Sequence, residues 1–182
     1  MNPHILLTND DGISSHGLAV LRDAVDGLGE ITTIAPATNT SGVARSITIS
    51  RPLSLNKAVF GGGWEGIACN GTPSDCVRVG FLGTEAPLPA LVLSGINLGS
   101  NMGSDVSYSG TVGAALEAAL RGCPAVAFSV ASRHPQWLEE AAAVVRGVTE
   151  AVLTRGLPPS TVLNVNLPDA PLEGLRRVIP VQ

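Results

Sequence analysis

Short apolar runs without polar alternation recur along this chain, and segments with helical periodicity lie between them. The clearest runs are residues 5–7, 91–93 and 125–128. Strands of a parallel sheet have this pattern because helices cover both of their faces, whereas half-exposed strands alternate apolar and polar residues. Strands that alternate with helices indicate βαβ units. The sequence therefore predicts an α/β fold around a mostly parallel sheet.

The same patterns predict the individual elements. Strands are expected at residues 4–8, 30–35, 90–94, 125–130 and 161–165, and helices at 17–28, at 111–121 and from Pro135 to Val152. A further helix should begin after Thr72, which can cap it, with Pro73 in its first turn. Residues 46–70 mix apolar residues with turn formers around three glycines at 61–63, which predicts a small β extension with a flexible tip.

Length and composition indicate one domain over residues 1–182. Hydrophobic residues make up 45% of the chain and charged residues only 14%, against about 25% in an average protein. The formal net charge is -4, and the 11 lysines and arginines form no cluster. A nucleic-acid polymer is therefore not expected as a partner. Any phosphate ligand must be held locally, by a metal ion or by backbone amides.

The cysteines and the amino-terminal sequence indicate the cellular compartment in which the protein is expected. Cys69, Cys76 and Cys123 are odd in number and lack CxxC spacing, so they are expected to be buried free thiols in a reducing cytosol. The chain begins without a signal-peptide pattern, and no apolar run approaches the roughly 18 residues that a membrane helix needs. We expect a cytoplasmic protein that does not enter the membrane.

Two adjacent acids follow the first predicted strand, in the sequence TNDDG at residues 8–12. In open α/β sheets, ligands bind at the carboxyl edge, where this loop must lie. Asp10 and Asp11 repel each other unless a cation lies between them. Asn, Asp and Gly also form ordinary surface turns, so a simple turn is the alternative interpretation.

Two further loops rich in small polar residues follow strands, at residues 36–45 and 94–111. The second carries four glycines and two asparagines, and Ser109 stands at the start of a predicted helix, where free backbone amides suit an anion. The alternative is an ordinary serine or threonine cap. This second loop lacks the GxGxxG pattern that a dinucleotide site carries between a strand and a helix, which disfavours a nicotinamide oxidoreductase. No GK[ST] occurs in the chain, which excludes a P-loop.

Hard oxygen donors in these loops favour one cation class. Asp10, Asp11, Ser41 and Asn97 offer carboxylate, hydroxyl and amide oxygens, which suit Mg²⁺, Mn²⁺ or Ca²⁺ better than zinc. The three histidines are scattered along the sequence. Adjacent residues on a strand point to opposite faces, so both aspartates can reach one ion only if the backbone turns, which Gly12 would permit.

These residues fall into six motifs that together resemble the SurE family of survival-protein nucleotidases. The motifs are TNDDG at 8–12, AP at 35–36, SG at 41–42, GTPSDC at 71–76, SGIN at 94–97 and YSGTV at 108–112. The resemblance implies a three-layer sandwich with a Rossmann-like sheet and a metal-dependent 5'-nucleotidase. It allows 3'-nucleotidase and exopolyphosphatase side activities. The resemblance reaches residues 164–168, and family members usually continue with an arm beyond the point where this chain stops. The resemblance also implies a homodimer or tetramer, and in the family that arm contributes to dimers and to the rim of the site.

The resemblance also implies residue roles. One divalent cation, Mg²⁺ or Mn²⁺ (or Ca²⁺ in crystals), would be bound by Asp10, Asp11, Ser41 and Asn97. The phosphate pocket would be formed by Asn101, Ser109, Gly110 and Thr111. Arg45 could hold a phosphate or be a solvated side chain. Cys76 is interpreted as packing and Asp75 as support for the helix that starts at Thr72.

The expected reaction is hydrolysis of a nucleoside monophosphate by in-line attack of a metal-associated water, with Asp10 and Asp11 as the catalytic residues. Either aspartate could also orient that water. The alternative is a nucleotide- or anion-binding module that does not turn its ligand over.

Overall fold

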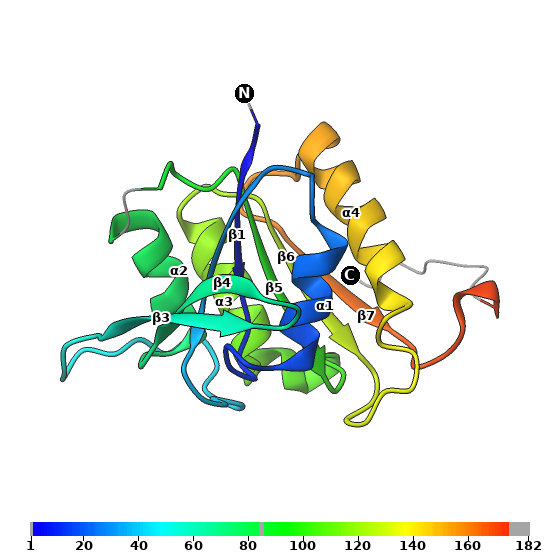
Figure 1. Ribbon diagram of the computed structural model, residues 1–182, viewed down its shortest axis with the longest axis horizontal. Coiled ribbons are helices and arrows are strands. Elements are labelled where there is room, and N and C mark those ends of the chain that lie inside the picture. Colours follow the sequence, from blue (N-terminus) through cyan, green and yellow to red (C-terminus); the bar gives the residue numbers. More distant parts are fainter. Residues whose placement is uncertain (1, 84–85, 175–182) are drawn as a thin grey trace.

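The computed structural model describes residues 2–83 and 86–174, and its centre is one seven-stranded sheet (Figure 1). The strand order is β3-β4-β2-β1-β5-β6-β7. Every neighbouring pair is parallel except β3 and β4, which run antiparallel. The strands are β1 His4–Thr8, β2 Glu30–Pro36, β3 Leu55–Phe60, β4 Trp64–Cys69, β5 Leu91–Leu98, β6 Ala125–Val130 and β7 Val162–Leu167. The predicted α/β class and mostly parallel sheet are confirmed.

Helices cover both faces of this sheet, so the fold has three layers. The helices are α1 His16–Ala24, α2 Pro73–Leu82, α3 Gly110–Leu120 and α4 Ala141–Arg155, with short 3-10 helices η1 Gly103–Ser107 and η2 Leu172–Gly174. Leu7 of β1 packs in one core with Leu18 of α1, while its neighbour Leu6 packs in the other with Val112 of α3. Successive strand residues point to opposite faces, which explains why the buried runs do not alternate. No helix within residues 2–83 and 86–174 is long and apolar enough to cross a membrane.

The predicted helix from Pro135 is wrong at its start, because α4 begins only at Ala141. The amides of Gln136 and Trp137 both donate to the Asp169 carboxylate, at 2.9 and 3.0 Å, and this contact holds the segment in a non-helical conformation. Leu138 is nevertheless buried, as its apolar pattern suggested. The first helix is also shorter than predicted and ends at Ala24.

The predicted β extension is a hairpin that is continuous with the main sheet. β3 and β4 are joined through the three glycines, and Gly61 and Gly63 have positive φ values of 55° and 108°. β4 then pairs with β2 in parallel. The hairpin therefore extends one edge of the sheet and does not form a separate unit.

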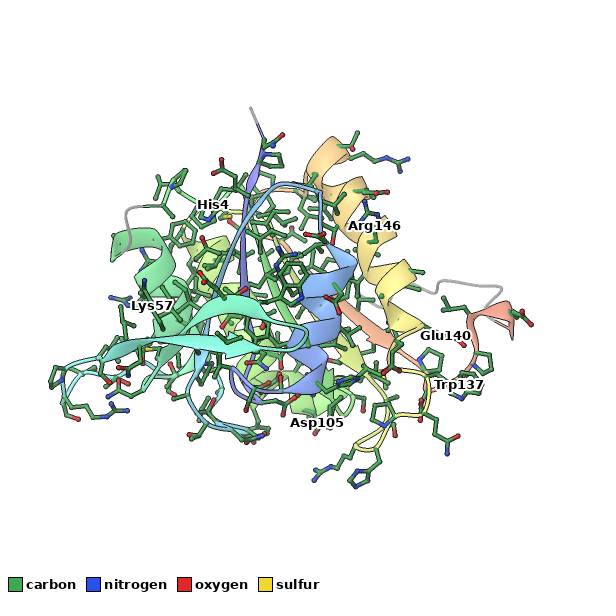
Figure 2. All side chains as sticks on the ribbon, viewed as in Figure 1. His4, Lys57, Asp105, Trp137, Glu140 and Arg146 are labelled. Carbon is green, nitrogen blue, oxygen red and sulfur yellow. The ribbon has the colours of Figure 1, made fainter. Side chains whose placement is uncertain are left out.

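The carboxyl ends of the parallel strands face the lower edge in Figure 1. The loops after β1, β2, β5 and β6 therefore lie at one edge of the sheet. Figure 2 shows Asp105, from the loop after β5, and Trp137, from the loop after β6, at this same edge. This common edge is where the polar loops singled out from the sequence meet.

Candidate active site

The loop after β1 turns sharply at the two acids, as a shared cation would require. Asn9 holds the turn: its amide nitrogen donates to the Gly12 carbonyl at 3.0 Å and to the Ser15 hydroxyl at 2.6 Å. Gly12 has a φ of 102°, a conformation that favours glycine. Asp10 is buried, with 3% of its surface exposed, and Asp11 is half-buried. The role of Asn9 was missed from the sequence, although its turn-forming side chain next to Asp10 was visible in the motif.

Asp10 lies against the start of α3. The Thr111 hydroxyl donates to Asp10 Oδ1 at 2.5 Å, and the backbone amides of Gly110 and Thr111 also approach this carboxylate. Burial raises the pKa of the Asp10 carboxyl, and these hydrogen bonds offset only part of the rise. The amino end of α3, which was expected to bind a phosphate, therefore faces a carboxylate of the chain itself.

Asp11 connects the three polar loops. Its Oδ1 accepts from the Asn39 amide nitrogen at 3.1 Å, and its Oδ2 accepts from the Leu98 backbone amide at 3.3 Å. Burial, and after it the negative charge of Asp10, raises the pKa of the Asp11 carboxyl. Each carboxylate is therefore costly to ionise in the metal-free protein, and a cation between the two would relieve that cost.

The two other predicted metal ligands lie on segments tied to this pair. The Ser41 backbone amide donates to Asn39 Oδ1 at 2.9 Å, so Asn39 bridges Asp11 and the loop that carries the exposed Ser41 side chain. Asn97 lies near the end of β5, next to the Leu98 amide that binds Asp11. The side-chain nitrogen of Asn97 donates to the Gly99 carbonyl at 2.6 Å. The side-chain oxygen of Asn97 therefore faces away from Gly99.

The predicted phosphate-binding side chains already have partners within the chain. Asn101 donates to the Ser129 hydroxyl at 2.9 Å, and its backbone amide donates to Asn166 Oδ1 at 2.8 Å. Ser109 caps α3 by accepting from the Val112 amide at 3.1 Å, which agrees with the alternative interpretation as an ordinary cap. Such a hydroxyl can still donate its own hydrogen to a ligand. The roles of Ser129 and Asn166 were missed, because nothing local in the sequence pairs them with Asn101.

The motif around Thr72 is structural. Thr72 and Asp75 form a reciprocal capping box at the start of α2, and Asp75 also accepts from the Thr48 amide at 3.1 Å. Burial alone would raise the pKa of the Asp75 carboxyl, but the hydrogen bonds from Thr48 and Thr72 outweigh it and hold the pKa below its ordinary value. Cys76 is a residue of α2 and packs in the core, as predicted. All three cysteines are free and buried.

Arg45 is exposed, and its backbone lies against α3. A Cβ on Gly113 would be 3.0 Å from the Arg45 Cα and 2.8 Å from the Ala44 carbonyl carbon. The loop after β2 therefore packs on the first turn of α3. Arg45 therefore lies beside the predicted phosphate site. The role of its guanidinium stays open between a phosphate contact and a solvated side chain.

The donor set fits a hard divalent cation. In the part of the chain that the structure describes, no group of three or more His, Cys, Asp or Glu side chains could hold a metal ion. His4 is buried with its Nε2 2.9 Å from the Thr32 hydroxyl, and the exposed His16 pairs with Glu139. What the edge of the sheet offers is two carboxylates with raised pKa values, a hydroxyl and an amide oxygen. Such ligands suit Mg²⁺ or Mn²⁺.

Two surface hollows lie away from this cluster. One of about 250 Å³ lies beside Cys123 and residues 157–161, and one of about 470 Å³ runs along β2, β3 and β4 between Lys57 and Glu65. Neither is lined by any predicted site residue. The polar groups named above converge at the edge of the sheet and not in these hollows, so the edge is the candidate site.

Comparison with known proteins agrees with the fold and with the motifs. The family model described as Survival protein SurE matches residues 5–180. A Pseudomonas putida protein named 5'-nucleotidase SurE is 46% identical over 174 residues, which cover 96% of this chain and 68% of the relative, and an Ectopseudomonas mendocina protein of the same name is 47% identical over the same shares. The crystal structure of the SurE protein from Aquifex aeolicus superimposes with a TM-score of 0.84 at 42% identity, covering 94% of this chain and 68% of that chain. This chain belongs to the SurE family.

Proposed function

We propose that this chain is a divalent-metal-dependent phosphatase that hydrolyses nucleoside 5'-monophosphates. One observation carries the proposal: two adjacent carboxylates, both with raised pKa values, lie at the carboxyl edge of the sheet against the start of α3. The relatives named 5'-nucleotidase SurE, at 46–47% identity, support the same activity. The proposal extends to 3'-nucleotides and polyphosphate as secondary substrates.

Asp10, Asp11, Ser41 and Asn97 would hold the cation. Once bound, the ion would neutralise charge on the phosphoryl oxygens and lower the pKa of a bound water. The chain's own residues would orient the reactants. One of the two aspartates would accept a hydrogen bond from the water that attacks phosphorus, in line with the leaving nucleoside oxygen. The Ser109 hydroxyl keeps its hydrogen for a phosphate oxygen, since its own oxygen accepts from the Val112 amide.

The wider setting is part of the proposal. We place residues 1–182 in one nucleotidase domain, acting in the cytoplasm as a homodimer or tetramer. The free, buried cysteines support a reducing compartment. The single continuous sheet supports one domain.

The test is an activity screen with Mn²⁺ or Mg²⁺ over 5'- and 3'-nucleoside monophosphates, repeated with a chelator. Turnover should need the metal, and equal rates with and without chelator would remove the cation from the mechanism. Asp10→Asn should lose more than the roughly 10–100-fold that changes behind a metal ligand cause. Asp26→Asn, at an exposed aspartate beyond the end of α1, is the matched control and should keep full activity.

The rival function is a module that binds a nucleotide or another anion without turnover. Asp10→Asn separates the two functions. A binding module should bind phosphate more tightly once the Asp10 charge is removed, while a phosphatase should lose turnover.

A further inference from the structure

The Thr111 hydroxyl is fully buried and has one hydrogen to donate. The exposed fraction of Thr111 is 0%, and its Oγ1 lies 2.5 Å from Asp10 Oδ1, at the short end of the range for a hydroxyl that donates to a carboxylate. A threonine hydroxyl carries a single donor. While that hydrogen is given to Asp10, Thr111 cannot donate to a phosphate oxygen, which is itself only an acceptor.

The rest of the α3 start is shaped around the same carboxylate. Gly110 leaves room for it, since a Cβ there would lie 2.8 Å from the Asp10 Cβ and 2.9 Å from Oδ2. The Asp10 backbone is held on its other side, because its carbonyl accepts from the Thr40 amide at 2.7 Å and from the Thr40 hydroxyl at 3.2 Å. The carboxylate is therefore fixed both through its main chain and through its Oδ1.

We propose that Thr111 is a positioning residue for Asp10, and that the start of α3 orients this carboxylate for the metal ion while the phosphate is bound by other groups. The inference rests on the proposed function and assigns Thr111 a different role from the phosphate ligand that the motif implied. A carboxylate held in this way would present its remaining oxygen lone pairs to the cation in a fixed orientation. A group that fixes a metal ligand in this way typically contributes a factor of about 10–100 to metal affinity.

The experiment measures Mn²⁺ binding by titration calorimetry on chelator-treated protein, without substrate. Thr111→Val keeps the side-chain shape but removes the hydroxyl, and it should weaken Mn²⁺ binding about 10–100-fold. Thr111→Ser keeps the donor and should bind nearly as the wild type does. Thr149→Val is the matched control: Thr149 is also 0% exposed, and its hydroxyl donates to the Val145 carbonyl at 2.7 Å inside α4. Its Mn²⁺ affinity should be unchanged.

Kinetics at saturating Mn²⁺ separate positioning from phosphate contact. For Thr111→Val we expect a KM for the nucleoside monophosphate close to that of the wild type. Unchanged Mn²⁺ affinity with a raised KM and weaker inhibition by inorganic phosphate would overturn the inference and return Thr111 to the phosphate pocket. If Thr111→Val does not fold, Thr111→Cys replaces it, because a thiol is a weaker donor.

A stability comparison tests the inference without the metal. In chelator, urea unfolding of Thr111→Val should show a larger loss than that of Thr149→Val, because Asp10 loses the donor to a buried carboxylate. Equal losses would overturn the positioning role. A wild type that binds no Mn²⁺ and hydrolyses nothing would end the proposed function, and this comparison would still decide whether Thr111 holds Asp10.

Discussion

Replacing Gly110 by alanine should damage the site more than the fold. The new Cβ would lie 2.8 Å from the Asp10 Cβ, whereas carbon atoms in good contact are about 3.5–4.0 Å apart. The two segments must therefore separate by about 0.7–1.2 Å. Asp10 cannot retreat freely, because Thr40 holds its carbonyl at 2.7 Å. A displacement of about 1 Å at a catalytic group can lower the rate about 100-fold.

The stability change should be modest by comparison. Overpacking costs about 1–3 kcal/mol, and the better helix propensity of alanine recovers up to about 1 kcal/mol. We therefore expect Gly110→Ala to lose about 1–2 kcal/mol of unfolding free energy by these magnitudes. The loss in kcat/KM for a 5'-nucleoside monophosphate with Mn²⁺ should be on the order of 100-fold.

Gly147→Ala is the control for this substitution. Gly147 lies in α4 and is exposed, and a Cβ added there would meet no atom within 4 Å. Alanine at this position should raise stability by about 0.5–1 kcal/mol and leave kcat/KM unchanged. Wild-type activity in Gly110→Ala would refute the reasoning, as would an equal loss of activity in both variants.

The remaining predictions concern the metal, an ion pair and a cap. Mn²⁺ at about 100 times its Kd should stabilise the wild type by about 2.7 kcal/mol, which raises Tm by several degrees in differential scanning calorimetry. An equal rise in Tm for Asp10→Asn would contradict the proposed role of Asp10 as a metal ligand. Glu117→Ala should cost about 1–3 kcal/mol in urea unfolding, because this 7% exposed carboxylate pairs with Arg121 at 3.1 Å. Glu150→Ala, in an exposed pair, should cost about 0.5 kcal/mol or less, and equal costs would count against burial as the cause. Asp75→Asn should lose stability at pH 7, since the pKa of Asp75 is lowered in the folded state. The difference from the wild type should shrink as pH falls below about 4, and a gap that stays constant down to about pH 2 would show that the charge is not responsible.

The sheet could be predicted from the sequence because its signal is local. Residues 125–128 are apolar without alternation, and β6 is buried along its whole length. The start of α4 could not be predicted in this way. Pro135 is a good first helical residue, but Asp169 captures the next two amides from outside the segment. At this position the tertiary contact with Asp169 outweighs the helix propensity of the segment.

In the candidate site, too, one part could be predicted from the sequence and another part could not. The meeting of the Asp10, Ser41 and Asn97 loops follows from parallel topology, which brings loops after strands to one edge. The partners of individual side chains do not follow from it. In the sequence Asn39 has the character of an ordinary turn former, yet in the fold it bridges Asp11 and Ser41.

By itself, the sequence determined the α/β class, the family and the edge of the sheet where chemistry can occur, since periodicity and motifs are carried by neighbouring residues. Only the tertiary structure decided what each polar group contacts. Thr111 and Asp10 are 101 positions apart in the sequence, and their hydrogen bond exists because the fold brings the start of α3 next to the loop after β1. A donor in a motif can serve a ligand or another side chain, and only the folded arrangement decides between them.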